Sequence, residues 1–275
     1  MISKNAYAKI NLTLDVVGKR DDGYHLLETV MQSVSLCDVV SVDKAEGIVI
    51  TCSEAGVPLD EKNTCHKAAR VFFERTGIAG GVKIDIEKNI PSEAGLGGGS
   101  SDAAAVLCLL NELYDARLSW FELEELAAKV GADVAFCIRG GAAVCRGIGE
   151  NMERIALPER PVLLVKPDFG ISTPEAYRMF DEKGAVSACG TNAFLDALSA
   201  GRDAYEHLSN DLEAAVCDLE IAKIRCEILE CGAVAAQMTG SGSCVFGVFD
   251  NEDTAARAER YMQGKTGFVK LCRTI

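Results

Sequence analysis

The sequence lacks two features of membrane and exported proteins. No uninterrupted apolar run approaches the roughly eighteen residues that suggest a bilayer-spanning helix. The first residues, MISKNAYAKINL, contain no basic segment followed by an apolar stretch of the kind that directs secretion. We therefore expect a cytoplasmic protein without a membrane partner.

Positive charge and histidine are also scarce. Lysine and arginine total 28 against 41 aspartates and glutamates, which gives a formal net charge of −13. This balance argues against nucleic acid as the main partner, and an anionic ligand would need a local positive field. The three histidines, His25, His66 and His207, lie too far apart in the sequence to form a local metal motif.

Twelve cysteines are present, but no two of them form a CxxC pair. They are scattered from Cys37 to Cys272, and most lie in apolar runs, as Cys108 does in VLCLL. This pattern favours reduced thiols in a core over disulfides or a metal centre.

The sequence does contain the composition and patterning of a folded α+β protein. Hydrophobic residues make up 48% and charged residues 25% of the 275 residues, which excludes a disordered chain. The length favours two domains. Prolines bracket a short apolar strand in PERPVLLVKP, residues 158–167, so we place the junction near residue 155, between domains 1–155 and 156–275.

Alternating patterns predict several strands in the first half. Apolar and polar residues alternate over residues 7–17, which predicts a half-buried strand whose polar face carries Lys9 and Asn11. GIVITCS and GVKIDIEK predict two further strands.

Capping residues and apolar patterns predict the helices. Asn63 can cap one helix, SDAAAVLCLLNELYD predicts a buried helix, and Ser119 with Glu122 predicts a capping box for a third that ends at Gly131. Later in the chain we expect helices near 174–183, 190–200, 210–231 and 251–263, strands near 233–238 and 244–249, and a last strand after them.

The stretch PSEAGLGGGSSDAAAVL, residues 91–107, follows a predicted strand and opens a predicted helix. Without Cβ atoms, several backbone N–H groups can converge on a ligand at the positive end of a helix dipole. Such a place binds anions, and phosphate above all. The alternative is a glycine-rich turn that only closes a tight corner between strand and helix.

Three known phosphate signatures do not match this stretch. No lysine follows the glycines, as a Walker loop requires, and Ser100 breaks the GxGxxG dinucleotide pattern. The protein-kinase pattern GxGxxGxV also fails, and the sequence has no HRD or DFG element. The loop is therefore of another type.

Together with other motifs, the loop indicates a family. PSEAGLGGGSSDAA resembles the ATP-binding signature of the GHMP kinases, and its double glycine before SSD resembles the branch that phosphorylates diphosphocytidyl-methylerythritol. Residues 8–32, AKINLTLDVVGKRDDGYHLLETVMQ, are similar to the N-terminal signature of that branch, and GADVAF, residues 131–136, to its catalytic element. ISTPEAY, LSNDLE and MTGSGSCVF follow in the expected order. Ala135 stands where the family usually has proline, which puts the stiffness of the catalytic loop in doubt.

The resemblance covers nearly the whole chain and implies the α+β, two-domain GHMP-kinase architecture. Its N-terminal domain is like ribosomal protein S5, its C-terminal domain is ferredoxin-like, and the active site lies in the cleft between them. The implied reaction transfers the γ-phosphoryl group of ATP to the 2-hydroxyl of diphosphocytidyl-methylerythritol.

Two residues of this sequence match the catalytic residues of the family. Asp133 matches the family's catalytic aspartate, which accepts the hydroxyl proton, and Lys9 matches the lysine that orients it and stabilises charge. Without the family, Asp133 in a loop would be a turn or cap residue, and Lys9 a solvated lysine on the polar face of a strand.

The resemblance also implies a substrate pocket. Tyr24 and Tyr177 match residues that sandwich the cytosine ring, and His25 matches one that hydrogen-bonds its edge. Thr173 matches a further substrate contact and has the chemistry of a helix N-cap. Asn11 shares the strand face of Lys9, and we expect it to contact the methylerythritol end of the substrate. Taken alone, DGYH equally fits a hairpin turn followed by a core tyrosine.

For ATP, the resemblance implies phosphate contacts through the backbone of the glycine stretch. The residues assigned are Pro91, Ser92, Glu93, Ala94, Gly95, Leu96, Gly97, Gly98, Gly99, Ser100 and Ser101. Asn63 and Lys88 match positions on the adenine side, although Lys88 equally fits an exposed strand end. Magnesium is implied because it accompanies ATP, and no protein ligand for it can be named.

Two other functions remain open. Another GHMP kinase, of the homoserine or mevalonate type, would share the ATP chemistry, although a cytosine clamp serves no purpose for so small an acceptor. A non-catalytic nucleotide-binding protein of the same fold would keep the anion site, although loss of Lys9 or Asp133 would then be expected. The sequence does not give the oligomeric state.

Overall fold

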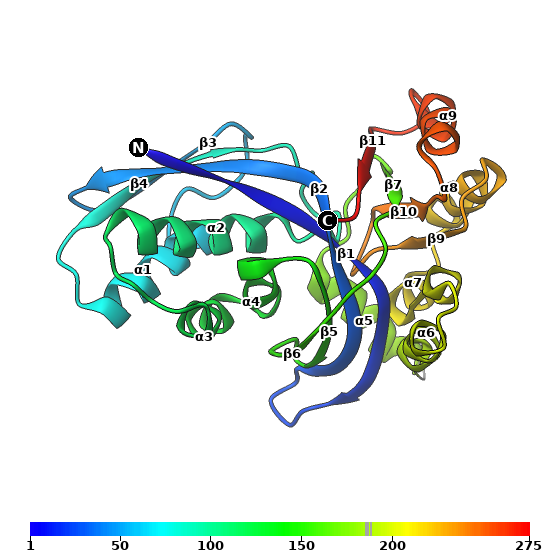
Figure 1. Cartoon of the computed structure of the whole chain (residues 1–275), viewed down its shortest axis with the longest axis horizontal. Helices are drawn as coiled ribbons and strands as arrows, with labels where there is room; N and C mark the ends of the chain where they lie inside the picture. The colour runs from blue at the N-terminus through cyan, green and yellow to red at the C-terminus, as the bar shows by residue number, and fades with distance from the viewer. Residues whose placement is uncertain (185–186, 188) are drawn as a thin grey trace. The chain divides into compact units, whose positions relative to one another are not determined.

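The computed structural model describes residues 1–184, 187 and 189–275 of the chain. Helices and strands follow one another in the mixed α+β order expected from the sequence (Figure 1). The chain divides into two compact units, each built from separate stretches of sequence. Unit 1 comprises Met1–Lys9, Leu36–Ile90 and Gly97–Gly140, and unit 2 comprises Ile10–Ser35, Pro91–Leu96 and Gly141–Ile275. A domain junction near residue 155 stays a prediction.

Two long strands, β1 (Ile2–Lys19) and β2 (His25–Ala45), supply backbone to both units. In unit 1, the later part of β2 pairs antiparallel with β4 (Gly81–Glu87), and β4 pairs parallel with β3 (Ile48–Cys52). The three alternate apolar residues of GVKIDIEK are all buried, as the period of two in this segment predicts.

Four helices pack together in unit 1, on one side of its strands (Figure 1). They are α1 (Thr64–Thr76), α2 (Gly98–Leu113), α3 (Trp120–Val130) and α4 (Ala132–Arg139). The predicted caps of α1 and α3 are confirmed. Asn63 accepts the Cys65 N–H, and Ser119 and Glu122 form a capping box. Most residues of α2 are buried, because its sequence is apolar on nearly every side.

In unit 2, β5 (Ala142–Gly147) pairs antiparallel with the first part of β2 and with β6 (Asn151–Ile155). The two-residue strand β8 (Ser209–Asn210) pairs parallel with β1. These pairings, with the adjoining parts of β1 and β2, form the first sheet region of unit 2.

The polar face of β1 in unit 2 corrects one prediction. A half-buried strand was expected, but Asn11, Thr13 and Asp15 are at most 4% exposed. Polar partners make this burial possible, since the Asp15 carboxylate accepts the N–H groups of Gly190 and Thr191.

The second sheet of unit 2 has the strand order β11-β7-β10-β9, and all neighbours are antiparallel. Its strands are β7 (Pro161–Lys166), β9 (Ala235–Met238), β10 (Val245–Val248) and β11 (Phe268–Arg273). Helices α8 (Leu219–Glu230) and α9 (Glu252–Met262) pack against it. The other helices described in unit 2 are α5 (Thr173–Lys183), α6 (Gly190–Ser199), α7 (Asp211–Val216) and the 3₁₀ helix η1 (Ala204–His207).

Two predicted helix boundaries in unit 2 are wrong. The single helix expected over 210–231 is α7 followed by α8, because Cys217 adopts a left-handed φ of 51° and Asp218 then caps a new helix. The N-cap residue of α5 is Ser172 and not Thr173. The Thr173 hydroxyl does not cap the helix and lies 3.2 Å from the hydroxyl of Ser241.

All twelve cysteines are free thiols, but only Cys65, Cys145 and Cys244 are buried. The prediction of core positions is therefore wrong for most of them. An apolar neighbourhood in the sequence does not ensure burial, because an amphipathic element turns part of its residues to solvent. Burial raises the pKa of the Cys65 and Cys244 thiols.

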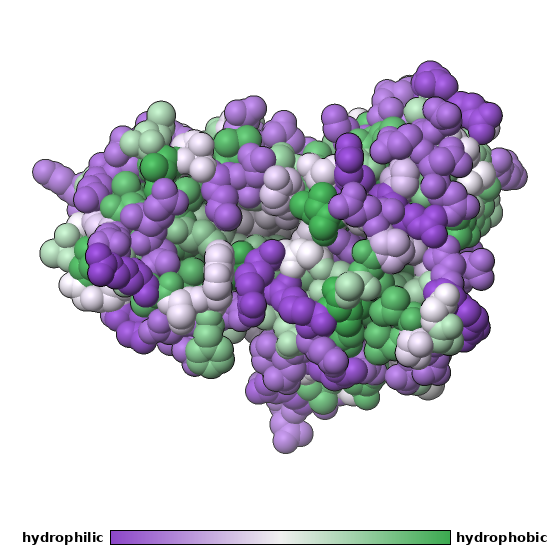
Figure 2. Space-filling model, in the orientation of Figure 1, coloured by the Kyte–Doolittle hydropathy of each residue, from purple (hydrophilic) through white to green (hydrophobic). Residues whose placement is uncertain are grey.

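Within the described part of the chain, no helix combines the length and the apolar character that crossing a membrane requires. On the face drawn in Figure 2, hydrophilic side chains surround separate hydrophobic patches.

Candidate active site

Lys9 and Asp133 form an ion pair in unit 1. The Nζ atom of Lys9 lies 3.2 Å from Oδ2 of Asp133. The lysine side chain is 5% exposed and the aspartate side chain 35%. A buried cation thus holds a carboxylate that still reaches solvent, which is the arrangement needed for a base that meets a substrate.

The structure places Asp133 in the first turn of α4, and not in the loop that the sequence predicted. Gly131 is the single residue between α3 and α4, so no loop separates the two helices. Its N–H bonds to Ala127 at the end of α3, and its carbonyl accepts the Val134 N–H at the start of α4. Ala135, which stands at the position of the family's usual proline, belongs to this helix and is buried, with 2% exposure.

Gly97 lies directly against the stem of Lys9. A Cβ atom at this glycine would be 3.0 Å from both Cγ and Cε of Lys9, and its φ of 70° is left-handed. A Cβ at Gly98 would meet Ile90 at 3.1 Å and the ammonium of Lys88 at 3.2 Å. Packing against the protein itself therefore favours a bare backbone at these two positions, whatever else binds there.

The N-terminus of α2 has the features of an anion site. Gly97 is its N-cap and makes no side-chain capping bond, and the first turn holds no acidic residue. Backbone N–H groups in the first turn of a helix have no intrahelical acceptor, so they attract negative charge. Both donors of Ser101 have partners within the protein, because its hydroxyl donates to the carbonyl of Tyr7 at 2.7 Å and its backbone N–H to the carbonyl of Gly97 at 2.9 Å.

The first part of the glycine stretch, residues 91–96, belongs to unit 2 and contacts the turn between β9 and β10. The carbonyls of Glu93 and Ala94 accept the N–H groups of Ser243 and Cys244 at 3.2 and 3.3 Å. A Cβ on Gly95 would lie 2.0 Å from the carbonyl oxygen of Thr239. This glycine is thus also required by close backbone packing.

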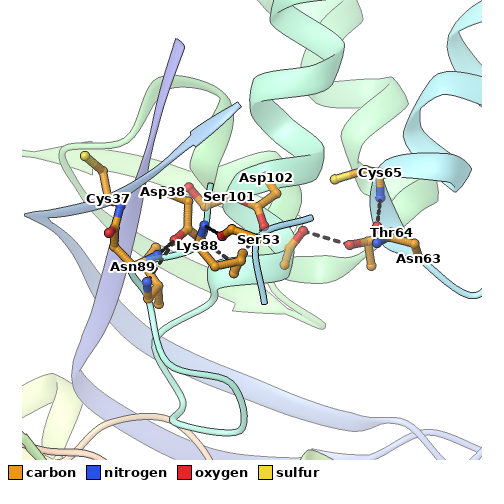
Figure 3. A network of polar contacts seen from close by, with 12 residues as sticks. Cys37, Asp38, Ser53, Asn63, Thr64, Cys65, Lys88, Asn89, Ser101 and Asp102 are labelled. Atoms are coloured by element: carbon orange, nitrogen blue, oxygen red, sulfur yellow. Dashed lines mark hydrogen bonds and ion pairs between the residues drawn. The ribbon is translucent and has the colours of Figure 1, made fainter. Parts of the chain in front are cut away.

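Lys88 is buried between two carboxylates and is not an exposed strand end (Figure 3). Its ammonium pairs with Asp38 and lies 2.8 Å from Oδ2 of Asp102. Asp38 also accepts the N–H groups of Asn89 and Ile90 at 2.5 and 2.8 Å. The group thus joins β2, the chain after β4 and the start of α2.

The three charged residues Asp38, Lys88 and Asp102 affect one another's protonation. Burial raises the pKa of Asp102 to about 7, and the nearby Asp38 adds to the rise while Lys88 opposes it. Burial also opposes the charge on Lys88, but the two carboxylates outweigh it and raise its pKa. The ammonium therefore stays charged, and burial favours the protonated form of Asp102.

Asn63, the second residue expected on the adenine side, is 7% exposed. Its side chain accepts the Cys65 N–H at 2.8 Å and donates to the Pro58 carbonyl at 2.6 Å. The next residue, Thr64, donates its hydroxyl to the carbonyl of Gly99 at 2.8 Å (Figure 3). Asn63 thus anchors the start of α1, and Thr64 links that start to the glycine stretch.

Asn11 is held in unit 2. Its backbone N–H donates to the hydroxyl of Thr239 at 3.0 Å, and its side-chain amide donates to Thr29 at 2.9 Å. The turn between β9 and β10 contains Gly240 and Gly242, both with positive φ.

Two of the three residues expected around the cytosine, His25 and Tyr177, lie together in unit 2. The rings of His25 and Tyr177 are stacked, with centroids 4.6 Å apart and planes at 16°. Nε2 of His25 lies 2.8 Å from Oδ1 of Asp181. Tyr24, in the turn that joins β1 to β2, is 63% exposed, so its ring is available to solvent.

Sequence reasoning missed three carboxylates, Asp38, Asp102 and Asp181. The first two are isolated acidic residues inside apolar segments, SLCDVV and SSDAAAV. A lone carboxylate in such a segment must find a buried partner, and this was the available signal. Asp181 lies one helical turn after Tyr177, on the face expected to meet the substrate.

Comparison with known proteins finds family matches in both halves of the chain. The family models described as "GHMP kinases N terminal domain" and "GHMP kinases C terminal" match residues 63–141 and 193–267. A protein named 4-diphosphocytidyl-2-C-methyl-D-erythritol kinase from Clostridium botulinum (strain Alaska E43 / Type E3) is 42% identical, covering 98% of this chain and 99% of that protein. Another of that name, from Clostridium tetani (strain Massachusetts / E88), is 43% identical with the same coverage.

Solved structures agree with these relatives. A crystal structure of 4-(cytidine 5'-diphospho)-2C-methyl-D-erythritol kinase matches with a TM-score of 0.82 and 34% identity, covering 99% of both chains. A homoserine kinase from Cytophaga hutchinsonii matches with a TM-score of 0.76 and covers 97% of this chain and 94% of its own. At 18% identity, this second likeness concerns the fold alone.

Proposed function

The chain belongs to the GHMP kinase family and, within it, to the 4-diphosphocytidyl-2-C-methyl-D-erythritol kinases, and from this premise we propose that it transfers the γ-phosphoryl group of ATP to the 2-hydroxyl of 4-diphosphocytidyl-2-C-methyl-D-erythritol. ATP is the co-substrate of this family. The observation that carries the proposal is the ion pair of Lys9 with Asp133 beside the glycine-capped start of α2.

Asp133 is the base in this proposal. Its carboxylate accepts the proton of the acceptor hydroxyl as the hydroxyl oxygen attacks phosphorus. General-base catalysis of this kind raises the reaction rate about 10²- to 10⁴-fold. Lys9 keeps the carboxylate in place through the contact at 3.2 Å. Its positive charge also offsets the negative charge that gathers on the transferred phosphoryl group.

The backbone of the glycine stretch receives the phosphates in this proposal, with the N–H groups at the start of α2 as donors. The protein is strongly acidic overall, so a local positive field must overcome a net charge of −13. Lys9 and the positive end of α2 supply such a field at Gly97, where they meet.

Magnesium enters this proposal as the ion that accompanies ATP. Of the residues that the structure describes, no three or more histidine, cysteine, aspartate and glutamate side chains are grouped so as to hold a metal. Mg²⁺ often binds through substrate phosphates, water and only one or two carboxylates, so the chemistry does not need such a group. When bound, the ion neutralises part of the phosphate charge.

Two features favour the cytidyl acceptor over homoserine or mevalonate. Tyr177 presents an aromatic ring next to His25, a residue able to read a base edge, and Tyr24, which precedes His25 in the sequence, adds an exposed ring. A small aliphatic acceptor has no use for aromatic stacking. A non-catalytic nucleotide-binding protein, in turn, would have no need to keep the pairing of Lys9 with Asp133.

The proposal is tested by ATP consumption with magnesium and one of three acceptors: diphosphocytidyl-methylerythritol, homoserine or mevalonate. We expect turnover with the cytidyl acceptor alone and a loss of about 10²- to 10⁴-fold in Asp133→Asn. The matched control is Asp115→Asn, which removes an exposed carboxylate of unit 1 and leaves activity unchanged. Turnover with another acceptor would refute the substrate assignment, and ATP binding without any turnover would refute the enzyme.

A further inference from the structure

Two aromatic side chains of α5 fix the orientation of His25 in unit 2. Its ring is stacked on Tyr177, and the Phe180 ring meets it edge-on at 88°, with centroids 6.2 Å apart. The His25 side chain is only 10% exposed. The neighbouring Tyr24 is largely in solvent, so the packing that holds His25 comes from α5.

Asp181 determines which nitrogen of His25 carries the hydrogen. Its Oδ1 lies 2.8 Å from Nε2 of His25, and its Oδ2 lies 2.6 Å from Nζ of Lys19. The hydrogen bonds from Lys19 and His25 lower the pKa of Asp181, so the carboxylate is ionised and can only accept. In the neutral form of the ring the hydrogen therefore lies on Nε2, and Nδ1 is an acceptor.

We propose that Asp181 is a positioning residue that sets base specificity by holding His25 in this tautomer. The inference rests on the proposed function, in which His25 meets the edge of the cytosine. Cytosine carries an amino donor at C4, whereas uracil carries a carbonyl acceptor at the same place. An acceptor at Nδ1 pairs with the amino group and opposes the carbonyl, so cytidine esters bind and uridine esters are rejected.

The stacking geometry supports this reading of the base edge. A base that hydrogen-bonds to Nδ1 lies close to the plane of the His25 ring. Because that plane is only 16° from the plane of Tyr177, the base also lies nearly parallel to the tyrosine ring. Edge recognition by His25 and stacking on Tyr177 are thus compatible in one pose.

Lys19 makes Asp181→Asn an informative variant. The ammonium can only donate, so it holds the amide oxygen of the new asparagine on its own side. The amide NH₂ group then faces Nε2 of His25, and this group can only donate. Nε2 becomes the acceptor, the hydrogen moves to Nδ1, and the edge that the base meets changes from acceptor to donor.

The matched control is Glu182→Gln. Glu182 is the next residue of α5, is 61% exposed, and pairs with Arg178 at 2.7 Å. Its substitution makes the same change of charge one position away and leaves the contact between Asp181 and His25 in place.

The first measurement is a long-range ¹H–¹⁵N correlation spectrum of the free protein, with His25 assigned from its loss in His25→Gln. We expect the Nε2–H tautomer in the wild type and in Glu182→Gln, and the Nδ1–H tautomer in Asp181→Asn. An Nδ1–H tautomer in the wild type would overturn the inference.

The second measurement is calorimetric binding of CDP and UDP, which needs no phosphoryl transfer. We expect the preference for CDP to fall about tenfold to a hundredfold in Asp181→Asn and to stay unchanged in Glu182→Gln. An unchanged preference in a folded Asp181→Asn protein would overturn the inference. The protein could show the tautomer change and the expected loss of preference and still not turn over diphosphocytidyl-methylerythritol. That result would support the role of Asp181 and refute only the proposed function.

Discussion

A Cβ atom on Gly97 would lie 3.0 Å from both Cγ and Cε of Lys9, the lysine that holds Asp133. The glycine at the start of α2 and the ammonium beside the base are therefore positioned by the same contact. A side chain at this position must displace the lysine stem, because the stem is buried and has little room to move.

Gly97→Ala should lower activity more than stability alone explains. The left-handed φ of 70° costs an alanine about 1–2 kcal/mol, and displacement of Lys9 by a fraction of an ångström should lower kcat by about tenfold or more. Gly77→Ala is the control, since it has a φ of 67° and no atom within 4 Å of the new Cβ. Chemical denaturation and kcat check both variants, and equal kcat values would contradict the role of the contact.

Lys9→Met should lower kcat by about 10²- to 10³-fold with little change in the KM for the acceptor, because the lysine acts on charge that develops in the transition state. Methionine fills a similar buried volume, and Asp133 can be hydrated at 35% exposure. The folded state should therefore survive. Steady-state kinetics check this, with Lys83→Met as the control because it removes an exposed ion pair of β4. A rise in KM with an unchanged kcat in Lys9→Met would show that Lys9 acts in binding only.

Asp102→Asn should change how stability depends on pH. The pKa of Asp102 is raised to about 7 in the folded protein, so the folded state binds a proton that the unfolded state releases near pH 4. This contribution to stability is complete at low pH and is lost as the pH rises toward 7, by at most about 1.4 kcal/mol per unit. Asparagine removes the titration, so the free energy of unfolding should fall less steeply between pH 4 and 7.

The control for this titration is Asp85→Asn. A hydrogen bond from Thr51 lowers the pKa of Asp85, so its contribution is present above the unfolded pKa and is lost as the pH falls. Urea unfolding at several pH values separates the two cases. Parallel curves for Asp102→Asn and the wild type would show that Asp102 does not hold the proton.

Cys217→Gly should stabilise the protein by up to about 1 kcal/mol. Cys217 ends α7 with a left-handed φ of 51°, a conformation that glycine adopts without strain. The control is Cys226→Gly, inside α8 and also exposed, where glycine should destabilise by about 1 kcal/mol. Thermal unfolding gives the two signs, and destabilisation by both would contradict the assignment of the strain to Cys217.

The sequence by itself determined the features that depend on neighbours along the chain. Asn63 and the pair of Ser119 with Glu122 cap helices as predicted, because a cap joins groups two or three residues apart. The motifs around Lys9 and Asp133 indicated the family, and the structure brings these two residues together. Their pairing could be expected only through the resemblance, since 124 residues (133 minus 9) separate them.

Only the tertiary structure decided which polar residues are buried and how they are paired. The group of Asp38, Lys88 and Asp102 forms across gaps of 50 and 14 residues, and no local pattern encodes such a contact. The same holds for Asp181 beside His25, 156 residues away. Burial removes water from around Asp38, Lys88 and Asp102 and so strengthens their electrostatic interactions. The pKa values of Lys88, Asp102 and Asp181 all depend on neighbours that only the folded chain supplies.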